Sequence, residues 1–274
     1  MKVLVTGATG TVGGHIVEQL ISKGVEVRGL SRNLKNTSFP PEAQIVVGDL
    51  NNPDTLQVHL QTVDRLFLIT QSEQTETRFL ANQRIIRMAK EANVKKIVAL
   101  MDYEGNPIES IIQESGMDWT ILRPAEFMKN ALYFWAETIQ KEGIVRTGFP
   151  DAMSVRIHEA DIAAVAVEAL TEEGHHEKIY TLTGPQSLTN KSMITQISEI
   201  IGKPIELVEL TEEQVRQNSK NQGYDDEFIE YFLIGMAKNP PENAYTVLPT
   251  VEQVTGKPAR TFVQWVTENK HYFN

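Results

Sequence analysis

The chain has 274 residues, with 26 lysines and arginines against 36 aspartates and glutamates, a formal net charge of −10 at pH 7, and no cysteine. At roughly 150 residues per domain, this length predicts one large domain or a core with a smaller lobe. Without cysteine the protein has no disulfide, thiolate zinc site or cysteine nucleophile, and the acidic charge without any Lys/Arg-rich block argues against contact with nucleic acid.

The first half of the chain alternates short β-branched apolar runs with helix-patterned stretches, a pattern typical of βαβ units in a parallel sheet. Each expected strand is a nearly continuous apolar run, because helices would cover both faces of the sheet. The expected strands are Lys2–Thr6, Val25–Leu30, Gln44–Val47, Arg65–Ile69, Lys96–Leu100 and Trp119–Leu122. Between them, helical spacing predicts one helix that ends before Gly24 and another that closes near Asn93.

After Pro124 the pattern becomes more helical, with two strand-like pieces at Lys178–Leu182 and Ile205–Val208. The expected helices are one capped by Asp161 and running to Leu170, one over Ser192–Ile201 that ends at Gly202, and one opened by Thr211 with a capping box to Gln214. The predicted class is α/β, with a Rossmann-type doubly wound parallel sheet over 1–125 and 152–182. A smaller, mainly helical substrate lobe over 126–151 and 183–274 would pack on it as part of a single structural unit.

A glycine-rich turn, Thr6-Gly7-Ala8-Thr9-Gly10-Thr11-Val12-Gly13-Gly14, lies between the first predicted strand and the first predicted helix. In such a turn Gly7 permits the tight bend, Gly10 lets the backbone approach a pyrophosphate, and Gly13 allows close packing of the helix. The start of the helix offers amides and a positive dipole end to phosphate. The sequence therefore predicts a dinucleotide site built by Gly7, Thr9, Gly10, Thr11, Val12 and Gly13. The alternative is a glycine-rich turn that binds no ligand.

The end of the second predicted strand indicates which dinucleotide is preferred. NAD sites usually carry an Asp or Glu about 20 residues beyond the glycines, where it binds the ribose 2′-hydroxyl. This chain has Ser31, Arg32 and Lys35 in that region and no carboxylate. Arg32 suits a 2′-phosphate, Ser31 offers a hydroxyl and Lys35 adds charge, so we expect NADP(H) to be preferred over NAD(H). The alternative is that both cations are merely solvated.

These motifs, with Val47-Gly48-Asp49-Leu50 and Trp119-Thr120-Ile121-Leu122-Arg123-Pro124, resemble the NmrA-like branch of the atypical short-chain dehydrogenase/reductases. The resemblance covers nearly the whole chain and continues in order through Glu126–Asn130, Asp161–Ala163, Tyr180–Pro185 and Thr255–Pro258. It implies a Rossmann core, a smaller substrate lobe and a cleft between them. It also implies binding of NADP(H), with some members reducing quinones, azo dyes or activated double bonds and others acting as redox-sensing regulators.

The resemblance also places individual residues along the cofactor. Asp49 and Leu50 would flank the adenine, and Ile69, Thr70 and Gln71 would follow the ribose and nicotinamide. Near the nicotinamide the resemblance places Leu100, Met101, Pro124 and Ala125. This agrees with the rule that ligands bind beyond the carboxyl ends of strands in doubly wound sheets. For each position the alternative is core packing or a helix cap, and for Asp49 it is turn chemistry.

The common catalytic pair of short-chain dehydrogenases is missing. In that pair a Tyr protonates the substrate and a Lys four residues later lowers its pKa, but no Tyr of this chain has Lys four residues on. Hydride transfer to an easily reduced acceptor remains feasible, since the cofactor carries the chemistry. Tyr103 and Asp102 are the candidate proton donors, with packing as the alternative for Tyr103.

An aromatic segment follows the predicted nicotinamide-facing turn. Flat aromatic side chains suit a planar acceptor, and the candidates for the substrate pocket are Phe127, Tyr133, Phe134, Trp135 and Phe149. The alternative is that aromatics at helical spacing simply form core.

Two functions remain open. The first is an NADPH-dependent oxidoreductase that transfers hydride to a small planar acceptor such as a quinone. The second is a non-catalytic NADP(H)-binding redox sensor that works through a protein partner. The histidines form no metal-ligand pattern, so no metal site is expected. No run approaches the ~18 apolar residues of a membrane span and no signal-peptide pattern precedes the first strand, so we expect a cytoplasmic protein without membrane contact.

Overall fold

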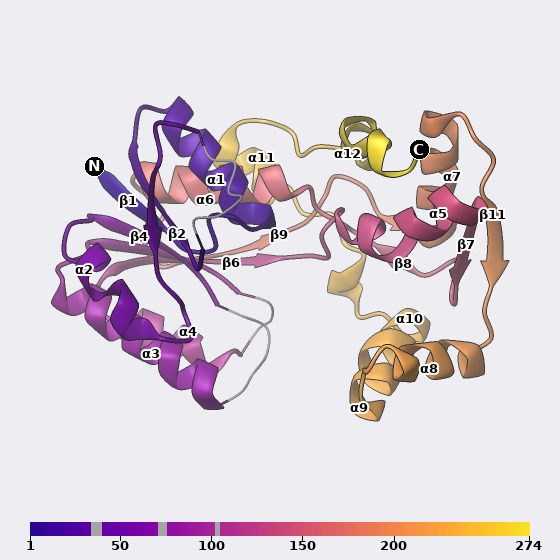
Figure 1. Cartoon of the computed structure of the whole chain (residues 1–274), viewed down its shortest axis with the longest axis horizontal. Coiled ribbons are helices and arrows are strands. Elements are labelled where there is room, and N and C mark those ends of the chain that lie inside the picture. The colour runs from indigo at the N-terminus through magenta and orange to yellow at the C-terminus, as the bar shows by residue number, and fades with distance from the viewer. Residues whose placement is uncertain (34–39, 71–75, 102–104) are drawn as a thin grey trace. The chain divides into compact units, whose positions relative to one another are not determined.

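The six strands predicted in the first half and the strand predicted at Lys178–Leu182 pair into one parallel sheet of seven strands, in the order β3-β2-β1-β4-β5-β6-β9 (Figure 1). They are β1 (Lys2–Val5), β2 (Glu26–Ser31), β3 (Gln44–Val47), β4 (Arg65–Ile69), β5 (Lys96–Leu100), β6 (Asp118–Pro124) and β9 (Lys178–Leu182). The expected Rossmann-type α/β class is therefore confirmed. Each predicted strand is present, with ends that differ by a residue or two.

Helices cover both faces of this sheet, as Figure 1 shows. One face carries α1 (Thr11–Ser22) and α6 (Glu159–Thr171), which pack on each other, with α11 (Thr250–Thr255) beside α6. The other face carries η1 (Pro53–Leu56), α2 (Gln57–Leu60), α3 (Glu76–Glu91) and α4 (Pro107–Gln113). Burial on both faces explains the continuous apolar runs: Val3, Leu4 and Val5 of β1 have no exposed surface.

The computed structural model describes residues 1–33, 40–70, 76–101 and 105–274. The chain forms two units. The first comprises Met1–Pro124, Glu159–Leu182 and Thr250–Lys257, and the second comprises Ala125–His158, Thr183–Pro249 and Pro258–Asn274. Relative to the boundaries expected from the sequence, Ala125 and 152–158 fall in the second unit, and 250–257 falls in the first because α11 packs on α6 and β9.

The second unit is built from helices and two small sheets. The strands are β7 (Ile144–Thr147) paired with β11 (Glu206–Glu209), and β8 (Met153–Ser154) paired with β10 (Leu188–Thr189). The helices are α5 (Glu137–Glu142), α7 (Asn190–Ile201), α8 (Glu212–Asn221), α9 (Asp226–Phe228), α10 (Met236–Lys238) and α12 (Phe262–Asn269), with short turns η4 (Glu242–Ala244) and η5 (Lys270–Tyr272). Two π-helical turns, η2 (Leu132–Ala136) and η3 (Ile229–Gly235), complete the unit. Phe262 and Trp265 stack at its core.

Local signals fixed most helix ends. Gly24 and Asn93 adopt positive φ values of 73° and 61° just beyond α1 and α3, and the Thr211 capping box is present. The prediction that Asp161 caps a helix is wrong: α6 begins at Glu159, so Asp161 lies inside its acidic first turn. Helix α7 begins two residues earlier than expected because Thr189, not a later residue, accepts the Ser192 amide. Among the described residues no helix has the length and apolar character needed to cross a membrane.

Candidate cofactor site and acceptor-side residues

The glycine turn leads directly from β1 into α1 and closes on itself. Gly7 has a φ of 61°, in the left-handed region that favours glycine, and its carbonyl accepts the Gly10 amide at 2.8 Å. A Cβ at Gly13 would lie 2.2 Å from the same carbonyl oxygen, and one at Gly10 would lie 3.0 Å from it. The turn therefore requires glycine at positions 7 and 13, leaves little room for a Cβ at Gly10, and forms a glycine cradle that is exposed at Gly10.

The start of α1 is suited to phosphate. Gly10 is the N-cap in an extended conformation, and no side chain caps the helix. First-turn amides have no acceptor within their own helix, and the first turn of α1 holds no acidic residue. Thr9 and Gly10 are exposed, Thr11 is half-buried, and Val12 and Gly13 are buried. A pyrophosphate would fit against exposed backbone here, held by amides and the positive end of the helix dipole.

The turn lies at the point where the strand order reverses. Strands β1 and β4 are neighbours, and the chain adds β2 and β3 on one side and β5, β6 and β9 on the other. The Ile69 amide donates to Thr6 Oγ1 at 2.9 Å. A Cβ at Gly7 would lie 3.1 Å from Ile69 Cγ2. The structure thus brings the predicted residue Ile69 against the glycine turn, at the place where doubly wound sheets bind ligands.

The end of β2 carries the residues predicted to select the dinucleotide. Ser31 is buried, and its hydroxyl donates to the Asn33 carbonyl at 2.7 Å, so its proton is already used locally. Arg32 is exposed and forms no hydrogen bond or ion pair with another residue that the structure describes. Lys35 lies outside the described residues. Arg32 is therefore the better placed of the two described residues to meet a 2′-phosphate.

Asp49 and Leu50 follow β3 in a tight turn. The Asp49 amide donates to Thr55 Oγ1 at 2.9 Å, its carbonyl accepts the Asn52 amide at 2.9 Å, and its Oδ1 accepts the Asn51 amide at 3.0 Å. The turn chemistry considered for Asp49 is therefore present. The half-buried Leu50 packs against the core of the first unit. The second carboxylate oxygen of Asp49 makes no hydrogen bond with a described residue, which leaves it open to a ligand.

The ends of β4 and β5 are tied together by backbone and hydroxyl contacts. The Leu100 carbonyl accepts both the Thr70 amide at 3.1 Å and the Thr70 hydroxyl at 2.9 Å. Leu100 and Met101 are buried, and the Met101 amide donates to the Leu122 carbonyl at 2.9 Å. These residues lie at the carboxyl ends of β4 and β5. Because the Thr70 hydroxyl already donates its proton to Leu100, its oxygen can only accept a further hydrogen bond. Gln71, Asp102 and Tyr103 lie outside the described residues.

Beyond half-buried Pro124, at the end of β6, the chain enters the second unit at half-buried Ala125. Phe127 forms a bridge with Ile157 and is half-buried. The aromatic residues that were predicted to line a pocket differ in their exposure. Tyr133 and Phe134 are exposed, whereas Trp135 is only 3% exposed in the core of the second unit.

Phe149 is also half-buried and adopts a positive φ of 56°. Its carbonyl accepts the Ala152 amide at 3.0 Å. Because consecutive helical residues face different directions, Trp135 packs inward while its two predecessors reach solvent. Trp135 therefore has the packing role that was weighed against a role in the pocket.

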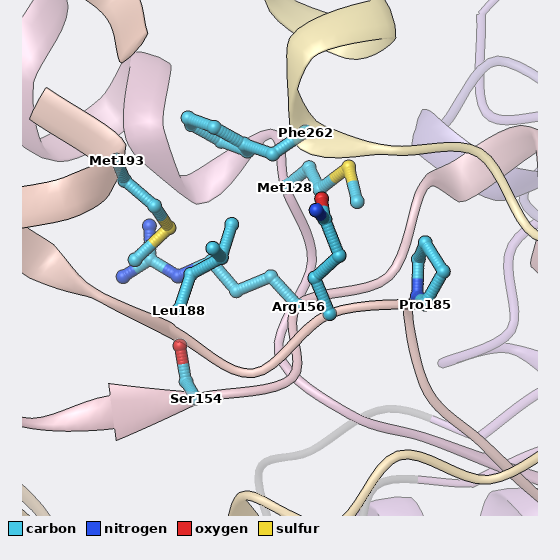
Figure 2. A pocket seen from close by; sticks show the side chains of 8 residues that line it. Met128, Ser154, Arg156, Pro185, Leu188, Met193 and Phe262 are labelled. Atoms are coloured by element: carbon cyan, nitrogen blue, oxygen red, sulfur yellow. The ribbon is translucent and has the colours of Figure 1, made fainter. Parts of the chain in front are cut away.

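Trp135 packs against a buried cation. The guanidinium carbon of Arg156 lies 4.9 Å from the centroid of the Trp135 ring. Arg156 Nη2 lies 3.0 Å from Glu126 Oε1, while Nε and Nη1 find no hydrogen-bond partner in the described part of the chain. Figure 2 shows the Arg156 side chain reaching toward Met193 in a pocket that Met128, Leu188 and Phe262 also line. The space left between these side chains is too narrow for a water molecule, so they form part of the packed interior of the second unit.

The structure also contains a second group of aromatic residues, which were not among the predicted site residues. Tyr224, Phe228 and Phe232 recur at a spacing of four residues. In the structure the rings of Tyr224 and Phe228 stack, and the Phe232 ring lies 5.2 Å from that of Phe228 at a tilt of 30°. The four-residue spacing is a signal that the sequence carries, but these residues were not among those predicted to line the pocket. The structure thus adds three aromatic residues to the exposed Tyr133 and Phe134.

A parallel sheet with a glycine cradle at its switch point defines a dinucleotide-binding protein of the Rossmann type. The model of a family described as NAD(P)H-binding matches residues 7–173. The chain belongs to this NAD(P)H-binding family, which confirms the resemblance to the NmrA-like reductases and the binding of NAD(P)H.

Relatives and solved structures agree with this assignment. The chain is 32% identical to an NAD(P)H azoreductase of Xenophilus azovorans over 96% of both chains. It is 33% identical to a (4-alkanoyl-5-oxo-2,5-dihydrofuran-3-yl)methyl phosphate reductase of Streptomyces griseus over 99% of both. Its fold matches an NADPH-dependent quinone oxidoreductase of Escherichia coli, solved with NADPH, with a TM-score of 0.79, 24% identity and full coverage of both chains.

Proposed function

We propose that the protein is an NADPH-dependent oxidoreductase that transfers hydride to a small planar acceptor such as a quinone. The observation that carries this proposal is the glycine cradle at the switch point of the sheet, where a Cβ at Gly13 would collide with the Gly7 carbonyl. The relatives named above include an azoreductase and a reductase of an unsaturated oxo-dihydrofuranyl methyl phosphate, and azo compounds and quinones share a flat, easily reduced π system. They support a planar acceptor for this chain as well.

The preference for NADPH over NADH rests on the end of β2. Arg32 is exposed there, has no partner in the described part of the chain, and is flanked by Ser31 and Asn33 rather than by a carboxylate. A guanidinium binds a phosphate through charge-assisted hydrogen bonds, whereas the 2′-hydroxyl of NADH offers no such charge. Lys35 would add a second cation.

The nicotinamide of the bound cofactor supplies the hydride. The residues of the chain bind, orient and exclude water: α1 and the glycine turn hold the pyrophosphate, and Leu100 and Met101 give an apolar floor. A proton must also reach the reduced acceptor. Asp102 and Tyr103 remain the proposed donors, and for a quinone water can serve instead.

The second candidate is a redox sensor that binds NADP(H) without turnover. It is favoured by one observation, the absence of any Tyr with a Lys four residues on. A sensor would bind NADP⁺ and NADPH with different affinities and would retain a protein partner through purification. The oxidoreductase, in contrast, needs only a small-molecule partner.

The test is a titration followed by a panel of acceptors. Binding of NADPH and NADH is first measured by nicotinamide fluorescence, and NADPH oxidation is then followed with quinones, azo dyes and enones. We expect tighter binding of NADPH and oxidation above the background rate with planar acceptors. A protein that binds NADPH but oxidises it no faster than background with every acceptor would contradict the proposed activity.

A further inference from the structure

Four aromatic side chains of the second unit form a contiguous group, called here the aromatic cluster. It consists of Tyr224, Phe228, Tyr231 and Phe232. The Tyr224 and Phe228 rings stack with centroids 5.0 Å apart, and the Phe232 ring lies 5.2 Å from that of Phe228. The Tyr231 ring meets the Phe232 ring edge to face, with centroids 4.9 Å apart. Printed ring contacts therefore join all four residues, and all of them belong to one unit of the structure.

Much of this cluster faces solvent. Tyr231 and Phe232 are 63% and 55% exposed, and Tyr224 and Phe228 are half-buried. Tyr231 and Phe232 lie in the π-helical turn η3, beside α8, α9 and α10 (Figure 1). π-helical turns are rare and occur frequently at functional sites. The exposed rings leave apolar area in contact with water, and a binding partner would cover that area.

The charges around the cluster indicate which kind of partner fits. Residues 212–238 contain six carboxylates and three cations. All three cations already form ion pairs: Arg216 with Glu212, Glu213 and Glu230, Lys220 with Asp226, and Lys238 with Glu212. A second copy of the chain would bring the same negative charge to the contact, and an anionic partner would also be repelled. A partner with positive charge is therefore favoured.

Two carboxylates of this segment have no cation beside them. Asp225 and Glu227 form no ion pair with a residue that the structure describes. Asp225 Oδ1 accepts the Phe228 amide at 2.7 Å and so caps α9, whereas the Glu227 side chain makes no hydrogen bond within the described part of the chain. In the sequence Asp225 follows Tyr224, and Glu227 precedes Phe228. Carboxylates without a cation and exposed rings thus occur together in one short segment.

An arginine side chain matches both of these features. Its guanidinium stacks on aromatic faces, and its planar fork pairs with a carboxylate through two parallel hydrogen bonds. A lysine ammonium is more strongly hydrated and lacks this planar shape, so it suits a ring face less well. Arginine is also the side chain that lies over aromatic rings more often than lysine.

We propose that the aromatic cluster is a docking surface for an arginine-bearing segment of a partner protein. Arginine side chains of that segment stack on the exposed rings and pair with the carboxylates that lack a cation. This inference goes beyond the proposed function and does not depend on hydride transfer, because the residues that carry it all lie between positions 224 and 232 of the second unit.

Titration of the whole chain with short peptides by isothermal calorimetry tests the proposal. The probe is an acetylated and amidated peptide of alternating glycine and arginine. Two matched peptides carry lysine or citrulline in place of arginine, and citrulline has nearly the shape of arginine without its charge. We expect the arginine peptide to bind most tightly, the lysine peptide about threefold more weakly, and the citrulline peptide at least about tenfold more weakly.

Two variants separate the ring face from the charge. Phe232→Leu keeps an apolar side chain but removes the ring, so it should weaken binding of the arginine peptide about two- to fivefold. Glu227→Gln removes one negative charge at nearly constant size and should weaken binding by about twofold or more, with a smaller effect as salt increases. The matched controls are Tyr272→Leu and Glu137→Gln, which alter an exposed tyrosine and an exposed carboxylate of the same unit outside the cluster. Both controls should leave the Kd unchanged.

Equal binding of the arginine and citrulline peptides would overturn the proposal, because charge would then play no part in recognition. Equal losses in Glu227→Gln and Glu137→Gln would also overturn it, since they would show only a general attraction to an acidic protein. A dimeric parent that becomes monomeric in Phe232→Leu would assign the surface to a second copy of the chain instead. The titrations need no acceptor, so their failure is distinguishable from a failure of the proposed oxidoreductase activity.

Discussion

At the scale of single residues, Gly13 is the most constrained position of the cofactor site. A methyl group there would lie 2.2 Å from the Gly7 carbonyl oxygen, whereas the nearest atom to a Cβ at the adjacent Gly14 is the Ala8 carbonyl oxygen at 3.7 Å. The two glycines share one helical turn and differ chiefly in this contact. They therefore form a matched pair.

We predict that Gly13→Ala lowers the free energy of unfolding by about 2 kcal/mol, because the backbone of the turn must shift to admit the methyl group. It should also weaken NADPH binding at least about tenfold, a loss of roughly 1.4 kcal/mol. Gly14→Ala should keep NADPH affinity and gain up to about 1 kcal/mol from helix propensity. Urea unfolding and fluorescence titration of both variants check this. Equal behaviour of the two would mean that the turn does not need glycine at position 13.

A second prediction at this scale concerns Arg32. Arg32→Ala should raise the Kd of NADPH at least about tenfold, because one charge-assisted contact to the 2′-phosphate is worth roughly 1.5–3 kcal/mol. The Kd of NADH should not change, since NADH lacks that phosphate. Arg146→Ala, which removes an exposed arginine paired with Glu142, is the control for net charge. An equal loss for both cofactors in Arg32→Ala would remove Arg32 from the 2′-phosphate site.

At the scale of elements, the segment after β6 and the segment before α6 are joined by an ion pair between buried Arg156 and the more exposed Glu126. Arg156 is 7% exposed and faces Glu126 on one side and the Trp135 ring on another. Removing one partner of such a pair leaves a buried charge uncompensated, whereas an apolar residue of similar size is often tolerated.

We therefore predict that Glu126→Ala destabilises the protein by roughly 2 kcal/mol, and that Arg156→Met costs less. A methionine there would pack among the apolar side chains that already line the pocket in Figure 2. Glu137→Ala, which breaks the exposed pair with Lys141, should leave stability unchanged. Denaturant unfolding of the three variants gives the ranking, and a greater loss in Arg156→Met than in Glu126→Ala would contradict it.

The elements also show where sequence reasoning succeeds. A strand that is buried on both faces has a continuous apolar sequence, so the bounds of β1, β4 and β5 could be predicted almost to the residue. The glycine turn could be predicted from its place between the first strand and the first helix. Asp161 was misread because an acidic residue suits both an N-cap and a first turn. The π-helical turns η2 and η3 were not predictable from periodicity, since they change which neighbouring side chains share a face. For that reason Trp135 was grouped with Tyr133.

At the scale of the whole molecule, net charge is a poor guide to the ligand. The protein carries a net charge of −10, yet it belongs to a family that binds a polyanionic dinucleotide. We therefore expect affinity to come from local groups, for which the first-turn amides of α1 and the exposed Arg32 are the proposed candidates. Because the chain has no cysteine, redox chemistry has no thiol of the protein to use.

Ligand binding should be visible as stability of the folded protein. A ligand at 100 times its Kd stabilises the folded state by about 2.7 kcal/mol. We predict that NADPH raises the Tm more than NADH at the same concentration, and that Gly13→Ala loses this shift while Gly14→Ala keeps it. Thermal unfolding with each cofactor provides the measurement, and identical shifts for NADPH and NADH would contradict the preference assigned to Arg32.

The most direct test of hydride transfer is a single-turnover reaction of the protein–NADPH complex with 1,4-naphthoquinone in the absence of oxygen. The two C4-deuterated epimers of NADPH are compared with ordinary NADPH. The account predicts that NADPH is consumed with formation of the hydroquinone, and that one epimer, and only one, slows the reaction because its deuteride is transferred. If NADPH is not consumed, or if neither epimer changes the rate, the protein does not transfer hydride from the cofactor to this acceptor in the observed step.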